Sequence, residues 1–510
     1  MKNVKAFFMN TLLLTATALL MRTIGVAFNA YLSQKIGEAG IGLFQLIMSV
    51  YTLAVTFASS GIRLAATRLT VEELSRPKGG SPRHVIRCCL GYSLLFGCAA
   101  AIALFFGAEW ISVHWLGERR PILSLKLLAV SLPFLAMSAA LSGYFTAVRK
   151  IVKLSSSQLF EQFIRITATV MLLTILLPKG LEYACVAIVI GSCLAEVGSF
   201  FFVFLLYWAE TRHRHDAGAS PKAVRRLLKI APAGCPCSSY VRSGLLTLEH
   251  LLIPVGFRKS GASSEGALAA YGKVHGMVLP IVLYPAALLN SLSSMLVPEM
   301  AECYEKKNTV RINYIITRVL QMTLLFSIGT AGIFYCFSGE VGRAVYGSSD
   351  TSRFIQLLAP LVPVMYLDTA VDGMLKGLGE QVSSMRYNII DSLLSVILVY
   401  TLLPRFAVKG YIVMLFATEI LNFTLSINRL NTISNFRIRL FGGIIAPVFC
   451  IAGSVSVTQL FFRFTGLEAA PGLQLALSVL LTTLVYLLSL RLSCCITKSD
   501  IRWFRSIFRK

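Results

Sequence analysis

Apolar runs of about 20 residues recur along almost the whole chain, and they constrain its fold more than any other feature. A helix of that length is needed to cross the hydrocarbon core of a bilayer, which is about 30 Å thick. Hydrophobic residues fill 56% of the 510 positions and charged residues 14%, which leaves too little polar surface for a soluble globule. The sequence therefore predicts an all-α integral membrane protein. We expect about fourteen spanning helices, near residues 6–30, 41–64, 87–112, 122–147, 157–178, 181–208, 228–253, 271–297, 312–337, 353–378, 385–403, 408–428, 440–462 and 473–491.

The basic residues are divided unequally between the loops on the two sides of the predicted membrane. With the first residues placed inside the cell, the inner loops hold about 29 Lys and Arg and the outer loops about 10. Cytoplasmic loops carry such an excess, so it accounts for the formal net charge of +24 without nucleic-acid binding. We expect a multi-pass protein of the cell membrane with both termini in the cytoplasm and with its first span retained.

The most polar connection separates about six spans from the rest of the chain. A second set of about six would enter the membrane with the same polarity, as in transporters built from parallel repeats. We therefore expect two six-helix lobes in a parallel pseudo-repeat plus two C-terminal helices. The expected parts are an N-terminal lobe (1–208), a cytoplasmic inter-lobe loop (209–229), a C-terminal lobe (230–430), two further helices (431–492) and a basic cytoplasmic tail (493–510).

Charged side chains within the predicted spans mark a cavity or a partner, because each costs about 2.5–3.5 kcal/mol at the bilayer centre. Arg22 lies in the first span with Gly25 and Asn29 on the same helix face, and Arg63 ends the second span. The alternatives are an Arg22 that snorkels to the interface and an Arg63 that is an ordinary interfacial anchor. We treat Arg22, Asn29 and Arg63 as candidate substrate-binding residues.

The seventh and eighth spans supply three more candidates for substrate binding. Arg242 and Glu249 are seven residues apart, so they share a helix face about 10 Å apart and leave room for a ligand or water. Lys273 opens the eighth span on the outer side. Glu161 and Arg165, by contrast, have the i, i+4 spacing of a structural ion pair. Single acidic residues that the sequence cannot rank are Glu196, Asp391 and Glu419.

The densest acidic signal lies in the tenth span, where Asp368, Asp372 and Lys376 follow one another at i+4 spacing. Two carboxylates one turn apart repel, so one of them holds a proton or both share a cation. The alternative is an internal pair of Asp372 with Lys376, which leaves Asp368 unexplained. We treat the two aspartates as candidate ion-coupling residues for Na⁺ or H⁺.

A helix bundle with short loops and both signs of charge inside has the composition of a transporter. An enzyme needs a place for chemistry, and no Walker loop, His-rich metal cluster or nucleophile and base constellation occurs. We expect no catalytic residue, no metal site and no resident cofactor. Arginines in a cavity suit phosphate or pyrophosphate, whereas an exporter of cationic drugs depends on its carboxylates. The charges favour an anionic amphiphile; a multidrug or cation antiporter and a membrane glycosyltransferase or ligase remain alternatives.

Three segments carry a resemblance to a known family: residues 252–302, APLVPVMYLDTAVDGMLKGLGEQ at 359–381 and IGEAGIGLFQLIMSVYTLAV at 36–55. The chain resembles the stage V sporulation protein B and polysaccharide-biosynthesis branch of the multidrug/oligosaccharidyl-lipid/polysaccharide (MOP) exporter superfamily, which is related to lipid II flippases. The resemblance covers essentially the whole chain. It implies a two-lobe fold that works by alternating access around a cationic central cavity.

The resemblance also implies a substrate and some site residues. The expected activity is flipping an undecaprenyl-pyrophosphate-linked saccharide, such as a peptidoglycan precursor, to the outer leaflet for cell-wall or spore-cortex synthesis. Arg22 with Gly25 fits a first-helix pattern of the lipid II flippases, and Lys273 is an approximate match to a basic residue on their eighth helix. Arg63 and Arg242 match by helix rather than by motif. Expected partners are the lipid-linked saccharide, the bilayer and cell-wall synthesis proteins, and a monomer is physically sufficient.

Overall fold

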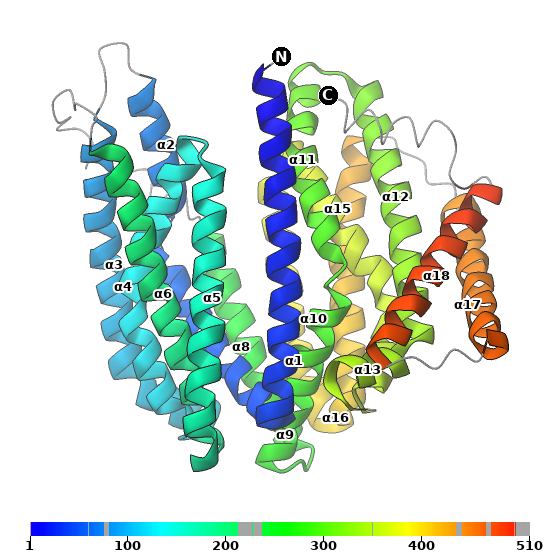
Figure 1. The fold of residues 1–510 in the computed structure, drawn as a ribbon, viewed down its shortest axis with the longest axis horizontal. Coiled ribbons are helices and arrows are strands. Elements are labelled where there is room, and N and C mark those ends of the chain that lie inside the picture. Colours follow the sequence, from blue (N-terminus) through cyan, green and yellow to red (C-terminus); the bar gives the residue numbers. More distant parts are fainter. Residues whose placement is uncertain are drawn as a thin grey trace. The chain divides into compact units, whose positions relative to one another are not determined.

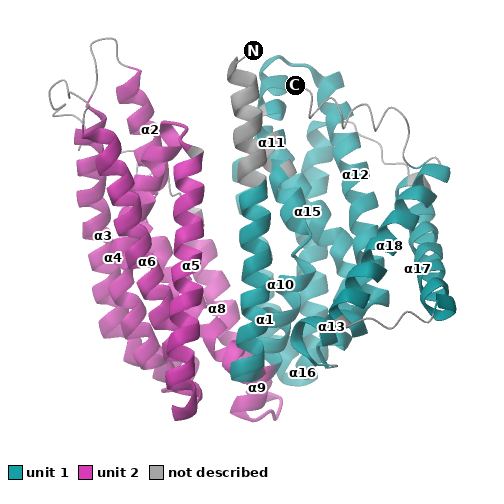
Figure 2. Cartoon of the chain, in the orientation of Figure 1, with its two compact units in different colours: residues 1–37, 270–510 teal, residues 38–269 magenta. Residues whose placement is uncertain are grey.

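Every element in the described part of the chain is a helix (Figure 1). The structure is a computed structural model that describes residues 2–59, 61–75, 81–212, 227, 237–348, 350–434, 441–465, 471–493 and 495. These residues form two compact units, unit 1 (residues 1–37 and 270–510) and unit 2 (residues 38–269), which Figure 2 shows in teal and magenta. The predicted all-α membrane fold is confirmed.

Among the described residues, ten helices are long and apolar enough to cross a membrane. Two of these segments contain a non-helical residue. The 59-residue segment Ala16–Leu74 contains Gly37 of α1 (Lys2–Ser59), and the 53-residue α16 (Gln381–Ile433) contains Ala407. Each of these two helices holds two of the expected spans, one on either side of the break. The total of about fourteen spans stays a prediction.

The break at Ala407 reverses the chain. Ala407 has φ 48° and ψ −127°, and Pro404 lies one turn before it. The Ser395 hydroxyl lies 3.4 Å from the sulfur of Met414, 19 positions further on. In a straight helix these residues would lie about 28 Å apart, so α16 consists of two antiparallel segments.

Unit 2 contains the second part of α1 and a set of helices held together by small residues. A Cβ on Gly143 would lie 2.6 Å from the Arg63 carbonyl oxygen, and one on Gly191 would lie 2.9 Å from the Thr169 nitrogen. Close approach of this kind is how membrane helices pack. The elements are α2 (Ile62–Leu74), α3 (Pro82–Trp110), the π-helix η1 (Ile111–Leu116), α4 (Pro121–Ala147), α5 (Ile151–Leu176), the 3₁₀-helix η2 (Leu177–Lys179), α6 (Leu181–Thr211), α8 (Cys237–Lys259) and α9 (Ser264–Tyr271).

A polar cluster ties together two turns of unit 2 outside the apolar spans. Arg120 donates two hydrogen bonds to the Glu118 carboxylate, at 2.8 Å and 2.7 Å, and Ser264 adds a third at 2.6 Å. Arg258 donates to the Leu116 carbonyl, 3.0 Å away. These hydrogen bonds connect the turn after η1 to the end of α8 and the start of α9.

We expect this cluster to stabilise the protein at neutral pH and to lose its effect in acid. The hydrogen bonds from Arg120 hold the pKa of Glu118 below its ordinary value of 4.5, although burial partly opposes them. A carboxyl whose pKa is lowered by folding stabilises the fold above its unfolded pKa, and the stabilisation disappears as the pH falls through the folded pKa. Glu118→Gln should therefore cost about 0.5–1 kcal/mol at neutral pH and less in acid. Thermal melting of the detergent-solubilised proteins tests this, and equal melting temperatures at neutral pH would contradict it.

Unit 1 contains the first part of α1 and the C-terminal half of the chain. Its core is formed where α12 and α15 pack against α11 and α16. The elements are the π-helix η3 (Gly272–Val278), α10 (Leu279–Val282), α11 (Ala286–Glu305), α12 (Thr309–Cys336), α13 (Ser338–Tyr346), α14 (Asp350–Leu358), the 3₁₀-helix η4 (Ala359–Leu361), α15 (Val362–Gly377), α16, the π-helix η5 (Phe441–Ile445), α17 (Ala446–Thr465) and α18 (Pro471–Leu492).

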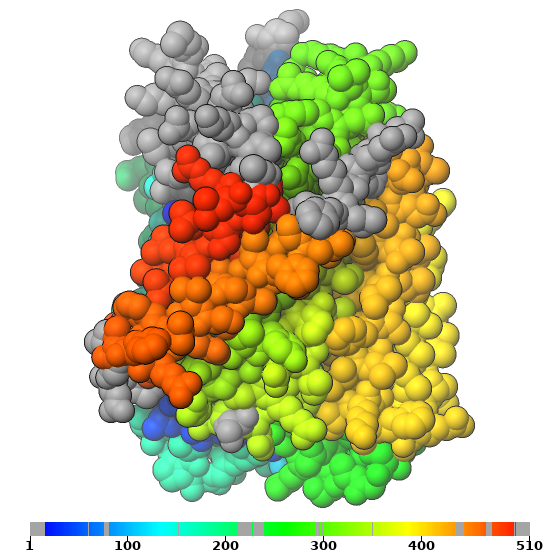
Figure 3. Space-filling view, turned by 90° about the vertical axis from the view of Figure 1, so that its right-hand side faces the viewer, coloured from blue at the N-terminus to red at the C-terminus, as the bar shows by residue number. Residues whose placement is uncertain are grey.

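The last two helices, α17 and α18, form an apolar face of unit 1. Figure 3 shows them in orange and red, running obliquely across this face beside α16 in yellow. They pack on α12, where Tyr486 donates a hydrogen bond to the Leu325 carbonyl at 2.8 Å. Their outer side exposes large apolar residues such as Phe449 (74%) and Phe464 (82%). A face of this composition suits contact with lipid.

The two units divide the chain differently from the two predicted lobes. Residues 1–37 belong with the C-terminal half, and residues 237–269 belong with helices of the predicted N-terminal lobe. The first change of unit falls at Gly37, whose φ of 70° ends the first part of α1. The predicted lobe boundaries stay a prediction. The inter-lobe loop and the basic tail lie mostly outside the described residues.

Candidate functional site

The predicted site residues are distributed over both units, and each unit is described separately. Unit 1 contains Arg22, Asn29, Lys273, Asp368 and Asp372. Unit 2 contains the other three, Arg63, Arg242 and Glu249.

A broken helix in unit 1 lies beside the first part of α1. The chain passes from η3 through α10 to α11, with Pro280 and Pro285 along the way. A proline has no backbone N–H, so Pro280 leaves the Gly276 carbonyl without its usual donor four residues on. Asn29 of α1 supplies that donor through its side-chain amide. Pro280 therefore creates a carbonyl acceptor that a side chain from another helix fills.

Arg22 contacts the same broken helix at Leu283, seven residues after Gly276. Its Nη2 donates a hydrogen bond to the Leu283 carbonyl, 2.9 Å away. The neighbouring Thr23 hydroxyl lies 2.9 Å from the Tyr284 hydroxyl. A guanidinium has five N–H donors, so this single contact leaves most of its capacity for an oxyanion. Arg22 is partly buried, and one of its donors is directed onto a backbone carbonyl.

Two tyrosines hold the other side of the broken helix. Tyr366 of α15 donates to the Val282 carbonyl at 2.7 Å, and Tyr346 of α13 donates to the Met277 carbonyl at 2.8 Å. Both side chains are buried. Four carbonyls that an unbroken helix would use internally are therefore held by side chains from α1, α13 and α15, and this fixes the backbone next to Arg22.

The two aspartates of α15 have different partners. Lys376 pairs with Asp372 at 2.5 Å, and Ser384 of α16 also donates to Asp372. Asp368 instead accepts a hydrogen bond of 3.1 Å from Asn422, on the second segment of α16. The internal Asp372 and Lys376 pair is therefore present. Asp368 is held by the amide of Asn422, and a carboxylate beside an amide suits H⁺ or a hard cation such as Na⁺.

Lys273 lies in η3, near the aromatic rings of Phe354, Tyr271 and His275. Its ammonium is 3.5 Å from Asp350 and 5.8 Å from the ring centroid of Phe354. Two residues on, His275 stacks on Tyr271. Lys273 is thus engaged by α14 in this structure. π-Helical turns often occur at functional sites.

In unit 2, Arg63 and Arg242 are exposed and Glu249 is partly buried. α8 lies antiparallel to the second part of α1, because Thr247 donates to the Ser49 carbonyl at 3.2 Å and Phe57 stacks on Tyr240. Arg242 and Glu249, seven residues apart on this unbroken helix, share a face as predicted.

Two further features of unit 2 concern α5 and α6. The predicted pair of Glu161 with Arg165 is present at 2.6 Å. The structure also gives Glu196 a setting that sequence reasoning could not supply: Tyr51 donates to its carboxylate at 2.6 Å. Because 145 positions separate these two residues, the only signal in the sequence was a lone acid in an apolar span.

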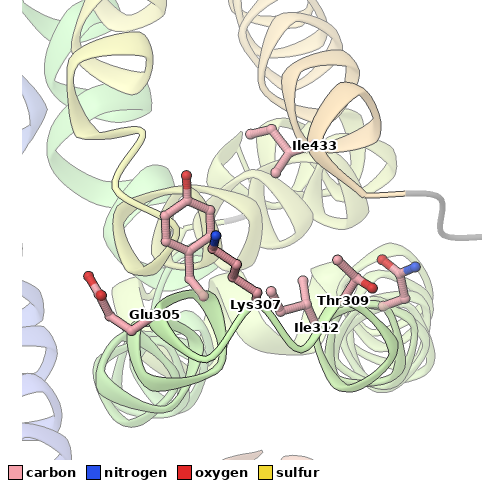
Figure 4. A pocket seen from close by; sticks show the side chains of 7 residues that line it. Glu305, Lys307, Thr309, Ile312 and Ile433 are labelled. Atoms are coloured by element: carbon pink, nitrogen blue, oxygen red, sulfur yellow. The ribbon is translucent and has the colours of Figure 1, made fainter.

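A cavity of about 450 Å³ lies apart from the predicted site residues, at the turn between α11 and α12. Figure 4 shows Lys307 and Ile312 at this turn, with Ile433 of α16 above them. Lys307 has φ 51°, which ends α11 and lets the chain enter α12. The other lining residues are Tyr304, Glu305, Thr309 and Asn313.

The fold and the matches to known families agree on the class of protein. Residues 7–232 match the polysaccharide biosynthesis protein family, and residues 260–401 match the MatE family. The chain is thus similar to transporters of the MOP superfamily, which confirms the predicted resemblance, and its long apolar helices are those of a multi-pass membrane protein.

Particular relatives show the same similarity. Stage V sporulation protein B of Bacillus subtilis (strain 168) is 24% identical over 406 residues, which cover 79% of this chain and 78% of that protein. A structure described as lipid II flippase MurJ in an inward closed conformation matches with a TM-score of 0.69 and 15% identity, covering 97% of this chain and all of the other. An inward-facing multidrug resistance MATE family transporter matches with a TM-score of 0.61 and 11% identity, covering 82% and 98%. At these identities the solved structures establish the fold, and the substrate is a separate question.

Proposed function

We propose that this protein flips an undecaprenyl-pyrophosphate-linked saccharide, lipid II-like or another polysaccharide unit, from the inner to the outer leaflet by alternating access. The observation that carries the proposal is Arg22, a guanidinium inside a membrane span with one of its five donors on the Leu283 carbonyl. A permanently charged planar group at this depth suits a pyrophosphate better than a cationic drug. The names of the relatives, a lipid II flippase among them, support the same substrate class.

The test is a comparison of two cargoes in reconstituted vesicles. We expect the protein to move a fluorescent undecaprenyl-pyrophosphate disaccharide between leaflets and to leave a cationic dye inside the vesicles. Empty vesicles provide the control for spontaneous flipping. Dye efflux without lipid movement would contradict the proposal.

A multidrug or cation antiporter is the second candidate, because the MatE match covers residues 260–401 and so includes both aspartates of α15. In that function Asp368 would bind the cationic cargo directly. The two functions are separated by Asp368→Asn. It should abolish dye efflux from a drug exporter, whereas in a lipid flippase it should change the ion dependence of lipid movement.

For ion coupling we expect the two aspartates to behave differently. Asp368→Asn should remove the dependence of lipid flipping on Na⁺ or H⁺, since the carboxylate held by Asn422 would no longer bind a cation. Asp372→Asn should have the smaller effect, because Lys376 already neutralises that carboxylate. Flipping rates in vesicles with imposed Na⁺ and pH gradients measure this. An unchanged ion dependence in both variants would end the coupling proposal.

The remaining parts of the proposal concern the cellular setting. We propose that both termini are cytoplasmic, from the distribution of Lys and Arg. A role in cell-wall or spore-cortex synthesis is proposed from the likeness to stage V sporulation protein B. A monomer is sufficient, and cell-wall synthesis proteins are the partners we expect. Accessibility of a cysteine introduced at each terminus to an impermeant thiol reagent would test the orientation.

A further inference from the structure

A buried chain of hydroxyl groups leads away from Glu196 in unit 2. The Tyr51 hydroxyl lies 2.6 Å from Glu196 Oε2 and 2.8 Å from the Ser131 hydroxyl, and Ser131 in turn lies 2.9 Å from the Leu128 carbonyl. Tyr51 and Ser131 are 3% and 0% exposed. The chain thus joins α1, α4 and α6 and ends on an oxygen that only accepts.

This arrangement satisfies every member in both protonation states of Glu196. When the carboxylate is ionised, the Tyr51 and Ser131 hydroxyl groups both donate to it. When the carboxyl is protonated, its O–H donates a hydrogen bond to the Tyr51 hydroxyl. The Tyr51 hydroxyl then donates to Ser131, and the Ser131 hydroxyl donates to the Leu128 carbonyl. Rotation of two hydroxyl groups interconverts the two patterns. A hydrogen-bond network that only holds helices together needs a single arrangement of donors and acceptors, because none of its groups gains or loses a proton.

The charges around Glu196 favour uptake of a proton. The charged group near it is Arg165 of α5, which is already paired with Glu161 at 2.6 Å. The other titratable groups that face the site are Tyr51 of α1 and Cys193 of α6, while α4 contributes only the neutral Ser131. With Glu196 ionised the set carries one net negative charge, and with Glu196 protonated it is neutral. A neutral set costs less inside a membrane.

From this geometry we propose that Glu196 is a proton-binding site, with Tyr51 and Ser131 as its hydrogen-bond relay. The ligand is H⁺, which binds as a carboxylic O–H and is released again. This site lies in unit 2 and is separate from the aspartates of α15. We further infer that Glu196 binds and releases its proton during lipid movement. This part of the inference rests on the proposed function.

Infrared spectroscopy of the reconstituted protein tests the binding site without any transported lipid. We expect a carboxylic C=O band that disappears as the pH rises, and we expect Glu196→Gln to lack it. Glu161→Gln is the matched control, because it removes an acid from the neighbouring ion pair and should keep the band. A band that persists unchanged in Glu196→Gln would overturn the proposal.

Tyr51→Phe provides a second variant if Glu196→Gln does not fold. Phenylalanine keeps the ring and removes the relay hydroxyl, so the band should shift in both frequency and titration midpoint. A band unaltered in frequency and midpoint would also overturn the proposal.

Lipid movement supplies the last readout. Flipping of a fluorescent undecaprenyl-pyrophosphate disaccharide by the unmodified protein should change about tenfold per pH unit where proton occupancy limits the rate. Glu196→Gln should flatten that profile. If the infrared band titrates but no lipid moves, the proposed function fails and the proton site stands. If lipid moves and the profile is the same in Glu196→Gln, the site plays no part in transport and that part of the inference is wrong.

Discussion

Replacing Arg22 with alanine is expected to lower the rate of lipid flipping in vesicles by about ten- to hundredfold. A charge-assisted hydrogen bond to a phosphate contributes about 1.5–3 kcal/mol, and Arg22 sits in a partly buried position. Arg22→Lys should recover only part of the rate, because an ammonium keeps the charge and loses the planar fork that binds two oxygens at once.

The control for Arg22 has to distinguish a loss of substrate binding from a loss of the hydrogen bond that Arg22 donates to the broken helix. Thr23→Val serves this purpose, because it removes the neighbouring hydrogen bond to Tyr284 without changing charge. We expect it to flip lipid at close to the unmodified rate. An Arg22→Lys protein as fast as the unmodified one would show that recognition by the guanidinium at this position is wrong. Equal losses in Arg22→Ala and Thr23→Val would show that Arg22 acts on the backbone alone.

Gly191→Ala is expected to destabilise the protein by about 1–3 kcal/mol, the usual cost of overpacking a close contact. The new methyl group would lie 2.9 Å from the Thr169 backbone nitrogen and 3.1 Å from its Cα, as well as against its side-chain oxygen. Backbone atoms cannot turn aside as a flexible side chain would, so α5 and α6 would have to separate. Thermal melting of detergent-solubilised protein, followed by the fraction that stays monodisperse, measures the loss.

Gly91→Ala is the matched control in the same unit. Gly91 lies in α3 and nothing stands within 4 Å of the position that its Cβ would take. Alanine there should be neutral or stabilise the helix by up to about 1 kcal/mol, because it has the higher helix propensity. If both glycine variants melt alike, close packing of α5 on α6 is not what limits stability.

The sequence by itself determined the class of protein and its local interactions. Long apolar runs require membrane helices whatever their neighbours are, because each helix satisfies its own backbone in lipid. The pairs Glu161 with Arg165 and Asp372 with Lys376 were predictable for a similar reason, since residues four apart on a helix always meet.

The tertiary structure decided what the lone charged and polar residues contact. Arg22 donates a hydrogen bond to the Leu283 carbonyl, 261 positions away in the sequence. Glu196 accepts one from Tyr51, 145 positions away in the sequence. Such contacts depend on which helices dock and in which rotation, and helix docking is set by the packing of small and large side chains along the whole interface. The composition of a span therefore shows that a charge is buried, and only the packed bundle determines its partner.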